Sequence, residues 1–228
     1  MRVDTVPGLY LRMLALGPMK NFVTLVGPAS SPETAVVDPA WDVDAVLAAA
    51  REDGRTLTHA LVTHRHADHT NGLSGLLARA DVEVVVHEAD AHALPDEVPA
   101  HRLRRTSDGD AVRLGDLMVT GVHTPGHTSG SQCFTVHSAP PVVIAGDTLF
   151  VGACGRCDLP GGDVRAMYRS LHRVLGGLPD ETVLIPGHDY GDRPVSTLGH
   201  ERRTNPYLLA ADEEAFVAHR MRPREVRP

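Results

Sequence analysis

The chain has 228 residues, of which 42% are hydrophobic, and a formal net charge of −7 with a sequence pI near 6.0. That length can bury a substantial core, and no change of composition marks a boundary between two domains. Nucleic-acid binding depends on clustered Lys and Arg, so the acidic balance argues against a nucleic-acid partner. No stretch approaches the roughly 20 apolar residues that a membrane helix needs, so we expect no membrane partner either.

The N-terminus and the cysteines bear on cellular location. Residues 1–19 are interrupted by charged residues and prolines, and they lack the apolar core and cleavage site of a secretory signal. The three cysteines, Cys133, Cys154 and Cys157, are too few for the disulfide framework of a secreted protein, and their number is odd. We therefore expect a cytoplasmic protein.

Short apolar strands and amphipathic helices alternate along the chain. Residues 22–26 and 35–37 are predicted to form a strand hairpin around a turn rich in Pro, Ser and Gly, and this hairpin is expected to open the fold. A helix over 41–50 follows, because its apolar residues share one face. The next predicted elements are a strand at 60–63, a helix at 71–79, a strand at 82–86 and a short helix at 88–94.

The second half of the chain repeats this alternation after a polar stretch at 95–110. Strands are predicted at 111–114, 117–122, 132–136, 142–145 and 182–185, and helices at 164–175 and 212–220. The tail at 219–228, with its prolines and arginines, is expected to be loose or packed only at the surface. The pattern predicts a single α/β domain over 1–228, a layered sandwich with helices covering the outer faces of the sheets.

The first chemically informative segment is Thr63-His64-Arg65-His66-Ala67-Asp68-His69. It follows a predicted strand and precedes a predicted helix, so we expect its side chains on a tight loop at the end of the sheet. Three imidazoles and a carboxylate are costly to bury without partners, and a divalent metal ion supplies such partners. Neutral imidazole and carboxylate are usual ligands of Zn, Fe and Mn.

Three further segments place a His or Asp just past an apolar strand and beside a glycine that permits a sharp turn. They contain His127 in Thr-Pro-Gly-His-Thr, Asp147 in Gly-Asp-Thr, and His188 in Gly-His-Asp-Tyr. A lone histidine is more often a solvated side chain than a ligand. That interpretation applies to His59, His92, His101, His137, His172, His200 and His219, whereas His87 and His123 are predicted to be structural or orienting.

The ordered series H-x-H-x-D-H, T-P-G-H-T, G-D-T and G-H resembles the ligand signature of the metallo-β-lactamase superfamily, over residues 21–190. The resemblance implies a four-layer αββα sandwich with a metal site at one edge of its two sheets. It assigns His64, His66 and His127 to a first metal ion, Asp68, His69 and His188 to a second, and Asp147 to a bridging position. Asp68 is also the candidate catalytic residue, and Asp38 resembles an early aspartate that supports the loop.

A pair of divalent ions, with Zn expected first and Fe or Mn as alternatives, lowers the pKa of bound water and polarises a carbonyl group. Within the superfamily, the segments 146–150, 154–156 and 186–190 resemble glyoxalase II, the hydroxyacylglutathione hydrolase family. The resemblance implies hydrolysis of a thioester by a metal-bound hydroxide, with Arg156 and Tyr190 contacting the thiol carrier. A guanidinium suits a carboxylate there because it can bond it bidentately. The sequence departs from that family in two respects: only 38 residues follow Tyr190, where longer members carry a helical domain that helps hold glutathione, and Cys157-Asp158 replaces an aromatic pair.

A second reading is a persulfide dioxygenase of the same fold. The segment 154–159, together with His188-Asp189-Tyr190, Ser196-Thr197, Glu201 and Asn205-Pro206, resembles that family more closely than the longer hydrolases. The resemblance implies a single Fe(II) bound by His64, His127 and Asp147, with positions left open for substrate and dioxygen. The complete set of seven ligand-type residues favours the two-metal hydrolase over this reading.

Other readings are weaker. A nucleic-acid-processing or non-enzymatic member of the fold would need features such as a basic surface, which the charge balance opposes; a different small-molecule metallo-hydrolase stays open as the third reading. Cys154 and Cys157 have C-x-x-C spacing, but no second such pair accompanies them, and a loop beside the active site is the simpler interpretation. We expect a small-molecule, thiol-derived substrate, and a homodimer is left open.

Overall fold

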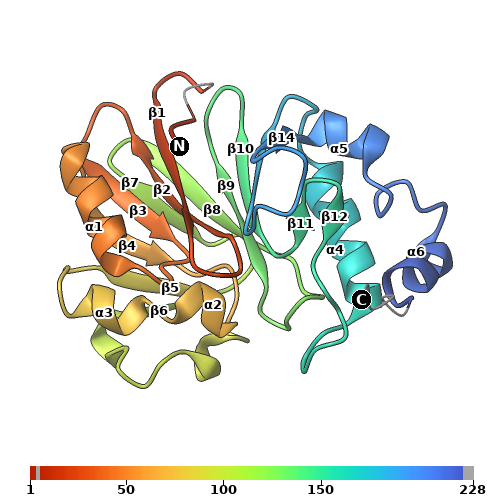
Figure 1. Ribbon diagram of the computed structural model, residues 1–228, viewed down its shortest axis with the longest axis horizontal. Coiled ribbons are helices and arrows are strands. Elements are labelled where there is room, and N and C mark those ends of the chain that lie inside the picture. The colour runs from red at the N-terminus through yellow and green to blue at the C-terminus, as the bar shows by residue number, and fades with distance from the viewer. Residues whose placement is uncertain (4–5, 223–228) are drawn as a thin grey trace.

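The computed structural model describes residues 1–3 and 6–222, and two six-stranded sheets face each other at its centre (Figure 1). The first sheet has the order β1-β2-β3-β4-β5-β6, with antiparallel pairing from β1 to β3 and parallel pairing from β3 to β6. Its strands are β1 (Leu9–Leu16), β2 (Asn21–Pro28), β3 (Glu33–Val37), β4 (Thr56–Leu61), β5 (Glu83–His87) and β6 (Leu103–Thr106).

The second sheet has the order β14-β13-β10-β9-β8-β7 and is antiparallel except for the β10–β13 pair. Its strands are β7 (Ala111–Leu114), β8 (Leu117–His123), β9 (Gln132–Val136), β10 (Val142–Gly146), β13 (Val183–Pro186) and β14 (Ser196–Thr197). A small hairpin of β11 (Leu149–Phe150) and β12 (Ala153–Cys154) lies beside it.

Helices cover the outer face of each sheet (Figure 1). On the first sheet these are α1 (Val43–Glu52), α2 (Ala67–Thr70) and α3 (Leu73–Leu77), with short 3₁₀ turns at Ala91–Ala93 and Ala100–Arg102. On the second sheet they are α4 (Val164–Gly176), α5 (Leu198–Thr204) and α6 (Glu213–Arg220). Within the described ranges, none of these helices is long and apolar enough to cross a membrane.

Three separate apolar cores explain why the layers stack in this way. One lies between the sheets, where Leu61 of the first sheet and Phe134 and Ile144 of the second are buried together. A second joins α1 and α3 to the outer face of the first sheet, and a third joins α4 and α6 to the second. Each sheet therefore buries both faces, which confirms the predicted four-layer αββα sandwich.

Most predicted elements are confirmed within a few residues, including the antiparallel β2–β3 hairpin and α4. Three predictions were wrong. The hairpin does not open the fold, because β1 precedes it and pairs with β2 along its whole length. The polar stretch 95–110 contains β6, which is an edge strand held by β5. The helix expected at 88–94 is a single 3₁₀ turn, whereas the helix expected at 71–79 is present in shortened form as α3.

The C-terminal tail also differs from the prediction. His219 and Arg220 belong to α6, and Arg220 is buried, so this part of the tail is not loose. Residues 223–228 lie outside the described part of the chain. The difference arises because α6 packs an apolar residue, Phe216, against the second sheet's helical layer, which the basic composition of the tail does not reveal.

The carboxyl ends of four strands meet at one edge of the sandwich. The strands are β4, β8, β10 and β13, and each is followed by one of the His- or Asp-bearing segments. Main-chain bonds connect neighbouring segments there: Gln132 N donates to Thr63 O at 2.8 Å, and Phe22 N donates to Gly187 O at 2.8 Å. The two sheets therefore hold this edge rigidly from both sides.

Candidate metal centre

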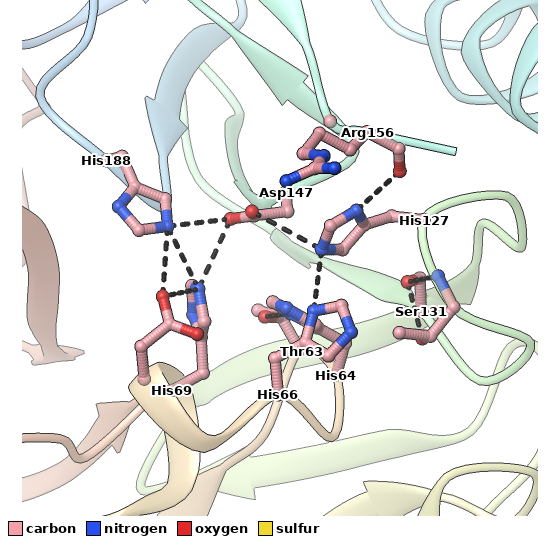
Figure 2. A network of polar contacts seen from close by, with 12 residues as sticks. Thr63, His64, His66, His69, His127, Ser131, Asp147, Arg156 and His188 are labelled. Atoms are coloured by element: carbon pink, nitrogen blue, oxygen red, sulfur yellow. Dashed lines mark hydrogen bonds and ion pairs between the residues drawn. The ribbon is translucent and has the colours of Figure 1, made fainter. Parts of the chain in front are cut away.

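The seven ligand-type side chains predicted from the sequence gather at this edge (Figure 2). His64 and His66 lie in the turn after β4, His127 follows β8, Asp147 follows β10 and His188 follows β13. Asp68 and His69 lie in α2 rather than on the expected loop, so one short helix turns both side chains toward the same point. Segments more than 100 residues apart, such as those of His69 and His188, are thus brought into contact.

The cluster divides into two groups with Asp147 between them. In the first group, the ligand atoms of His64, His66 and His127 all lie within 4.8 Å of one another, and His66 Nδ1 is 2.8 Å from His127 Nε2. In the second, Asp68 Oδ2 is 3.4 Å from the Nε2 atoms of both His69 and His188. Asp147 reaches both groups, because its Oδ2 is 3.4 Å from His127 Nε2 and its Oδ1 is 3.3 Å from His69 Nε2.

Asp38 orients two of these imidazoles from beneath the cluster. Its Oδ2 accepts from Thr63 Oγ1 at 2.6 Å and faces His69 Nδ1 at 2.8 Å, while its Oδ1 accepts from Thr63 N at 2.7 Å. Because the Thr63 hydroxyl proton is used in this way, its oxygen accepts from His64 Nδ1 at 3.0 Å. Asp38 therefore supports the loop, as predicted, and fixes the Nδ1 proton on both His64 and His69.

Main-chain carbonyls do the same for two other histidines. His127 Nδ1 donates to Arg156 O at 2.7 Å, and His188 Nδ1 donates to Met19 O at 2.8 Å. A neutral imidazole carries only one N–H, so the Nε2 atoms of these rings are bare lone pairs. The pair His69 Nε2 and His188 Nε2 are nevertheless only 3.2 Å apart.

Lone pairs and carboxylates that converge in this way repel one another unless a cation lies among them. Two buried atoms of the cluster, His64 Nε2 and Asp147 Oδ1, have no hydrogen-bond partner among the residues that the structure describes. Unpartnered buried polar atoms are rare and costly in folded proteins. The donor set, imidazole nitrogens with two carboxylates, therefore fits divalent Zn or Fe.

The protonation of the cluster follows from the same geometry. Burial alone would lower the pKa of His69, but the charges of Asp147 and Asp38 outweigh it and raise that pKa well above its usual range. Burial also opposes ionisation of Asp68, yet hydrogen bonding and the charge of His69 lower the pKa of Asp68 to about 2. Burial lowers the pKa of His66 to about 4. Burial opposes protonation of His188 as well, but its contact with Asp147 raises the pKa of His188. The carboxylates thus favour positive charge among the rings of the second group, as a bound cation would also provide.

Comparison with known protein families shows which family has this sequence pattern. The sequence model of the metallo-beta-lactamase superfamily matches residues 16–188. The chain belongs to the metallo-beta-lactamase superfamily. The match spans every one of the seven ligand-type residues, from His64 to His188.

Two curated superfamily members of different named activity are similar to the chain. The hydroxyacylglutathione hydrolase of Rhodospirillum rubrum is 35% identical over 243 residues, covering 90% of each chain. The human mitochondrial persulfide dioxygenase ETHE1 is 33% identical over 204 residues, covering 85% of this chain and 74% of that protein. Among solved structures, TTHA1623 in a di-iron-bound form has a TM-score of 0.74 and 32% identity, covering 86% of this chain and all of its own.

In the present protein, a cavity of about 630 Å³ opens over the ligand cluster. Its wall includes His66, Asp68, His127, Asp147 and His188. The two residues predicted to contact substrate, Arg156 and Tyr190, also line it. Seven of the nine predicted site residues therefore line one cavity, and the other two, His64 and His69, are buried in the same ligand groups. The roles of all nine as ligands or substrate contacts stay predictions.

The two predicted substrate residues differ in their surroundings. The Tyr190 ring is 53% exposed and stacks on the His188 ring, with centroids 4.6 Å apart and planes 7° from parallel. The Arg156 guanidinium is paired with Asp158, through Nε to Oδ1 at 2.9 Å and Nη2 to Oδ2 at 3.0 Å. The bidentate face expected to receive a substrate carboxylate is thus occupied by a side chain of the same loop.

Sequence reasoning missed several residues of the site. Tyr207 and Arg220, from the C-terminal segment, line the cavity. Asn21 donates to Asp68 Oδ2 at 3.0 Å and in turn accepts from Trp41 Nε1 at 2.8 Å. An asparagine at the first residue of a strand is a signal that could have identified this contact, whereas nothing local marks Arg220.

The remaining histidines and cysteines lie outside the metal-ligand groups of the described residues. His87 and His123 stack on each other with centroids 3.8 Å apart, in agreement with a structural role. The three cysteines are free and buried, and Cys154 lines the cavity, as expected for a loop beside the site.

Proposed function

We propose that the protein hydrolyses the thioester of a small thiol-derived substrate with two divalent metal ions, Zn first. The first ion would be held by His64, His66 and His127, the second by Asp68, His69 and His188, and Asp147 would lie between them. The observation that carries the proposal is the convergence of five imidazole rings and two carboxylates, Asp68 and Asp147, at one end of a cavity. When bound, such ions provide an ionised water nucleophile near neutral pH and polarise the thioester carbonyl.

The chain's own residues position the reactants. The hydrolysis adds water across the thioester, so that the acyl carbon gains an oxygen and the C–S bond breaks to release a carboxylic acid and a thiol. Asp68, ionised and held by Asn21, is the candidate acceptor for a proton of the attacking water. The exposed edge of Tyr190 and the loop of Arg156 border the thiol side of the cavity.

The test is a comparison of Asp147→Ala with Asp116→Ala. Asp147 contacts both groups of ligands, whereas Asp116 is an exposed carboxylate that bonds only Ser30 in the described part of the chain. We expect Asp147→Ala to lose thioester hydrolysis and metal uptake together, and Asp116→Ala to keep both. A metal-free Asp147→Ala protein with full activity would disprove the proposal.

A second candidate function is persulfide oxidation at a single Fe(II) bound by His64, His127 and Asp147. The specific observation in its favour is that the two unpartnered atoms of the cluster, His64 Nε2 and Asp147 Oδ1, both belong to this trio. Two histidines and one carboxylate form a common site for non-haem iron oxygenases. The similarity to the human persulfide dioxygenase supports the same candidate.

Metal analysis separates the two functions. Protein purified without added metal would be assayed for metal content, for release of thiol from a thioester, and for oxygen consumption with a persulfide. Two metal ions per chain and thioester hydrolysis support the first proposal. One iron per chain, with oxygen consumed only when persulfide is present, would replace it with the second.

A further inference from the structure

Arg220 is a buried cation in the wall of the cavity, and neither the motifs nor the metal site accounts for it. The residue ends α6 and is 8% exposed. Figure 1 shows α6 beside α4 on the outside of the second sheet, and the wholly buried Phe216 anchors it there. The helix thus directs a guanidinium from the outer layer of the sandwich to the same cavity as the histidines.

One short loop connects Arg220 to the metal-side histidines. Arg220 Nε donates to Gly155 O at 2.7 Å, and the next carbonyl along the chain, Arg156 O, accepts from His127 Nδ1 at 2.7 Å. The guanidinium is therefore only one peptide unit removed from the orienting contact of His127. Both His127 and Arg220 also line the cavity.

The charge of Arg220 has little compensation among the described residues, where Asp158 acts on it only through longer-range electrostatics. Its Nη2 is buried without a hydrogen-bond partner, and in the part of the chain that the structure describes no carboxylate forms an ion pair with it. The nearby thiols do not provide an anion either, because burial raises the pKa of Cys157 to about 11 and raises that of Cys154 further. Tyr207 contributes a ring face at 5.8 Å. A buried cation without an anion is strongly destabilising, so such sites are typically completed by an anionic partner.

We propose that Arg220 binds a carboxylate of the thiol carrier and thereby selects anionic substrates. This inference rests on the proposed function, since it assumes that the thiol-derived molecule occupies this cavity. A carboxylate fits because a guanidinium donates to it through parallel N–H groups. Arg156, the arginine that the sequence suggested for this role, is already paired with Asp158, whereas Arg220 Nη2 has no acceptor among the described residues.

The experiment measures binding rather than turnover, so that its result does not depend on whether the thioester is hydrolysed. The metal-loaded protein would be titrated calorimetrically with S-methylglutathione, a thioether that cannot be hydrolysed as a thioester, and with its dimethyl ester. The variants are Arg220→Gln, which keeps an N–H for Gly155 O, and Arg220→Lys, which keeps the charge. Arg203→Gln, an exposed arginine of α5 outside the cavity, is the matched control.

We expect Arg220→Gln to weaken binding of the free acid roughly tenfold to a hundredfold, as for other lost charged hydrogen bonds, and to leave binding of the ester unchanged. Arg220→Lys should retain part of the preference, and Arg203→Gln all of it. Equal weakening of acid and ester, or no weakening, would overturn the inference. If Arg220→Gln loads less metal or unfolds, the wild-type protein still decides, because equal affinity for acid and ester, or binding of neither, also overturns it.

If thioester hydrolysis is absent but the acid preference depends on Arg220, the inference stands and the proposed reaction fails. If hydrolysis is present but wild-type protein binds the acid and the ester alike, the reaction stands and the inference fails. The two proposals can therefore be separated with one set of variants.

Discussion

Asp90 provides the sharpest test of how the metal-side loops are held, because one wholly buried carboxylate receives four hydrogen bonds. Its Oδ2 accepts from Arg65 N at 2.9 Å and from Thr128 Oγ1 at 2.6 Å, and its Oδ1 accepts from Arg65 Nη1 at 2.7 Å and Gly130 N at 2.9 Å. Arg65 separates His64 from His66, and Thr128 follows His127. Asp90→Asn should therefore disturb the whole first group of ligands.

The magnitude follows from what the amide cannot do. Asparagine carries no charge, and its NH₂ group would face at least one donor where the carboxylate offered an acceptor. Removing one partner of a buried ion pair typically costs about 3–5 kcal/mol. Because the Arg65 side chain is 15% exposed and water can partly solvate it, we place the loss in free energy of unfolding near the lower end, at about 3 kcal/mol. Displaced supporting groups also lower metal affinity by roughly 10- to 100-fold.

The pH dependence has a definite sign. Burial opposes ionisation of Asp90, but hydrogen bonds from Thr128 and Arg65 outweigh it and hold the pKa of Asp90 below its usual value of 3.8. A lowered pKa in the folded state means that the stabilisation is complete above the unfolded value and is lost as pH falls through the folded one. The stability difference between wild type and Asp90→Asn should be constant at neutral pH and should shrink below about pH 4.

Urea unfolding of the chelator-treated protein, followed by circular dichroism, measures the stability change. Competition with a chromophoric chelator measures metal affinity. Asp81→Asn is the control, because Asp81 is 93% exposed and pairs with Arg102 at the surface, where such pairs contribute about 0–1 kcal/mol. If Asp90→Asn matched Asp81→Asn in both stability and metal affinity, the argument that Asp90 holds the metal-side loops would be refuted.

Three further predictions concern the same edge of the sandwich. Removing metal with a chelator should lower the thermal midpoint of the wild type, because saturating metal contributes up to about 4 kcal/mol to the free energy of unfolding. The midpoint of Asp147→Ala should not change, and equal shifts in both proteins would contradict metal binding at the cluster. Glu201→Gln should cost about 2 kcal/mol in urea unfolding, since this buried carboxylate accepts from Gly152 N at 2.8 Å and Asn205 Nδ2 at 3.0 Å, and an unchanged midpoint would rule this out. Gly187→Ala should reduce metal content after dialysis, because a Cβ there would lie 2.7 Å from Asp147 Oδ1; full metal occupancy would show that the backbone can yield.

The ligand-type residues could be predicted from the sequence because each short motif places a His or Asp directly after an apolar strand. Elements whose formation depends on distant partners were harder to predict. β1 alternates buried Leu9, Leu11 and Met13 with less buried residues, a strand pattern that was present but overlooked. β6 contains the residues Leu-Arg-Arg-Thr, and its pairing with β5 alone makes it a strand. Local propensity is weak in such edge strands, and tertiary context decides.

The residues of the cavity also divide into those that local motifs predict and those that distant packing contacts position. His127 and Asp147 could be placed from motifs, but Arg220 lines the same cavity only because Phe216 anchors α6 in the outer layer of the second sheet. A segment rich in Arg and Pro is usually solvated, so composition predicted a loose tail. One buried aromatic residue in each turn or two of a short helix is enough to reverse that expectation, since burying its side chain contributes about 1.5–3 kcal/mol.

The direction in which each imidazole presents its lone pair depends on the group that accepts its N–H. Some of these groups can be recognised in the sequence and others cannot. Asp38, which fixes the proton on His69, is a carboxylate just past an apolar strand, and this position can be recognised in the sequence. The structure adds that its backbone is left-handed, with a φ of 52°. The partners of His188 and His127 are the carbonyls of Met19 and Arg156, which any residue could supply. A ligand motif therefore specifies which rings are present, while the fold specifies which nitrogen is bare. Variants at Met19 that keep the backbone path should leave the metal site intact, whereas changes that move this carbonyl should impair it without altering any ligand.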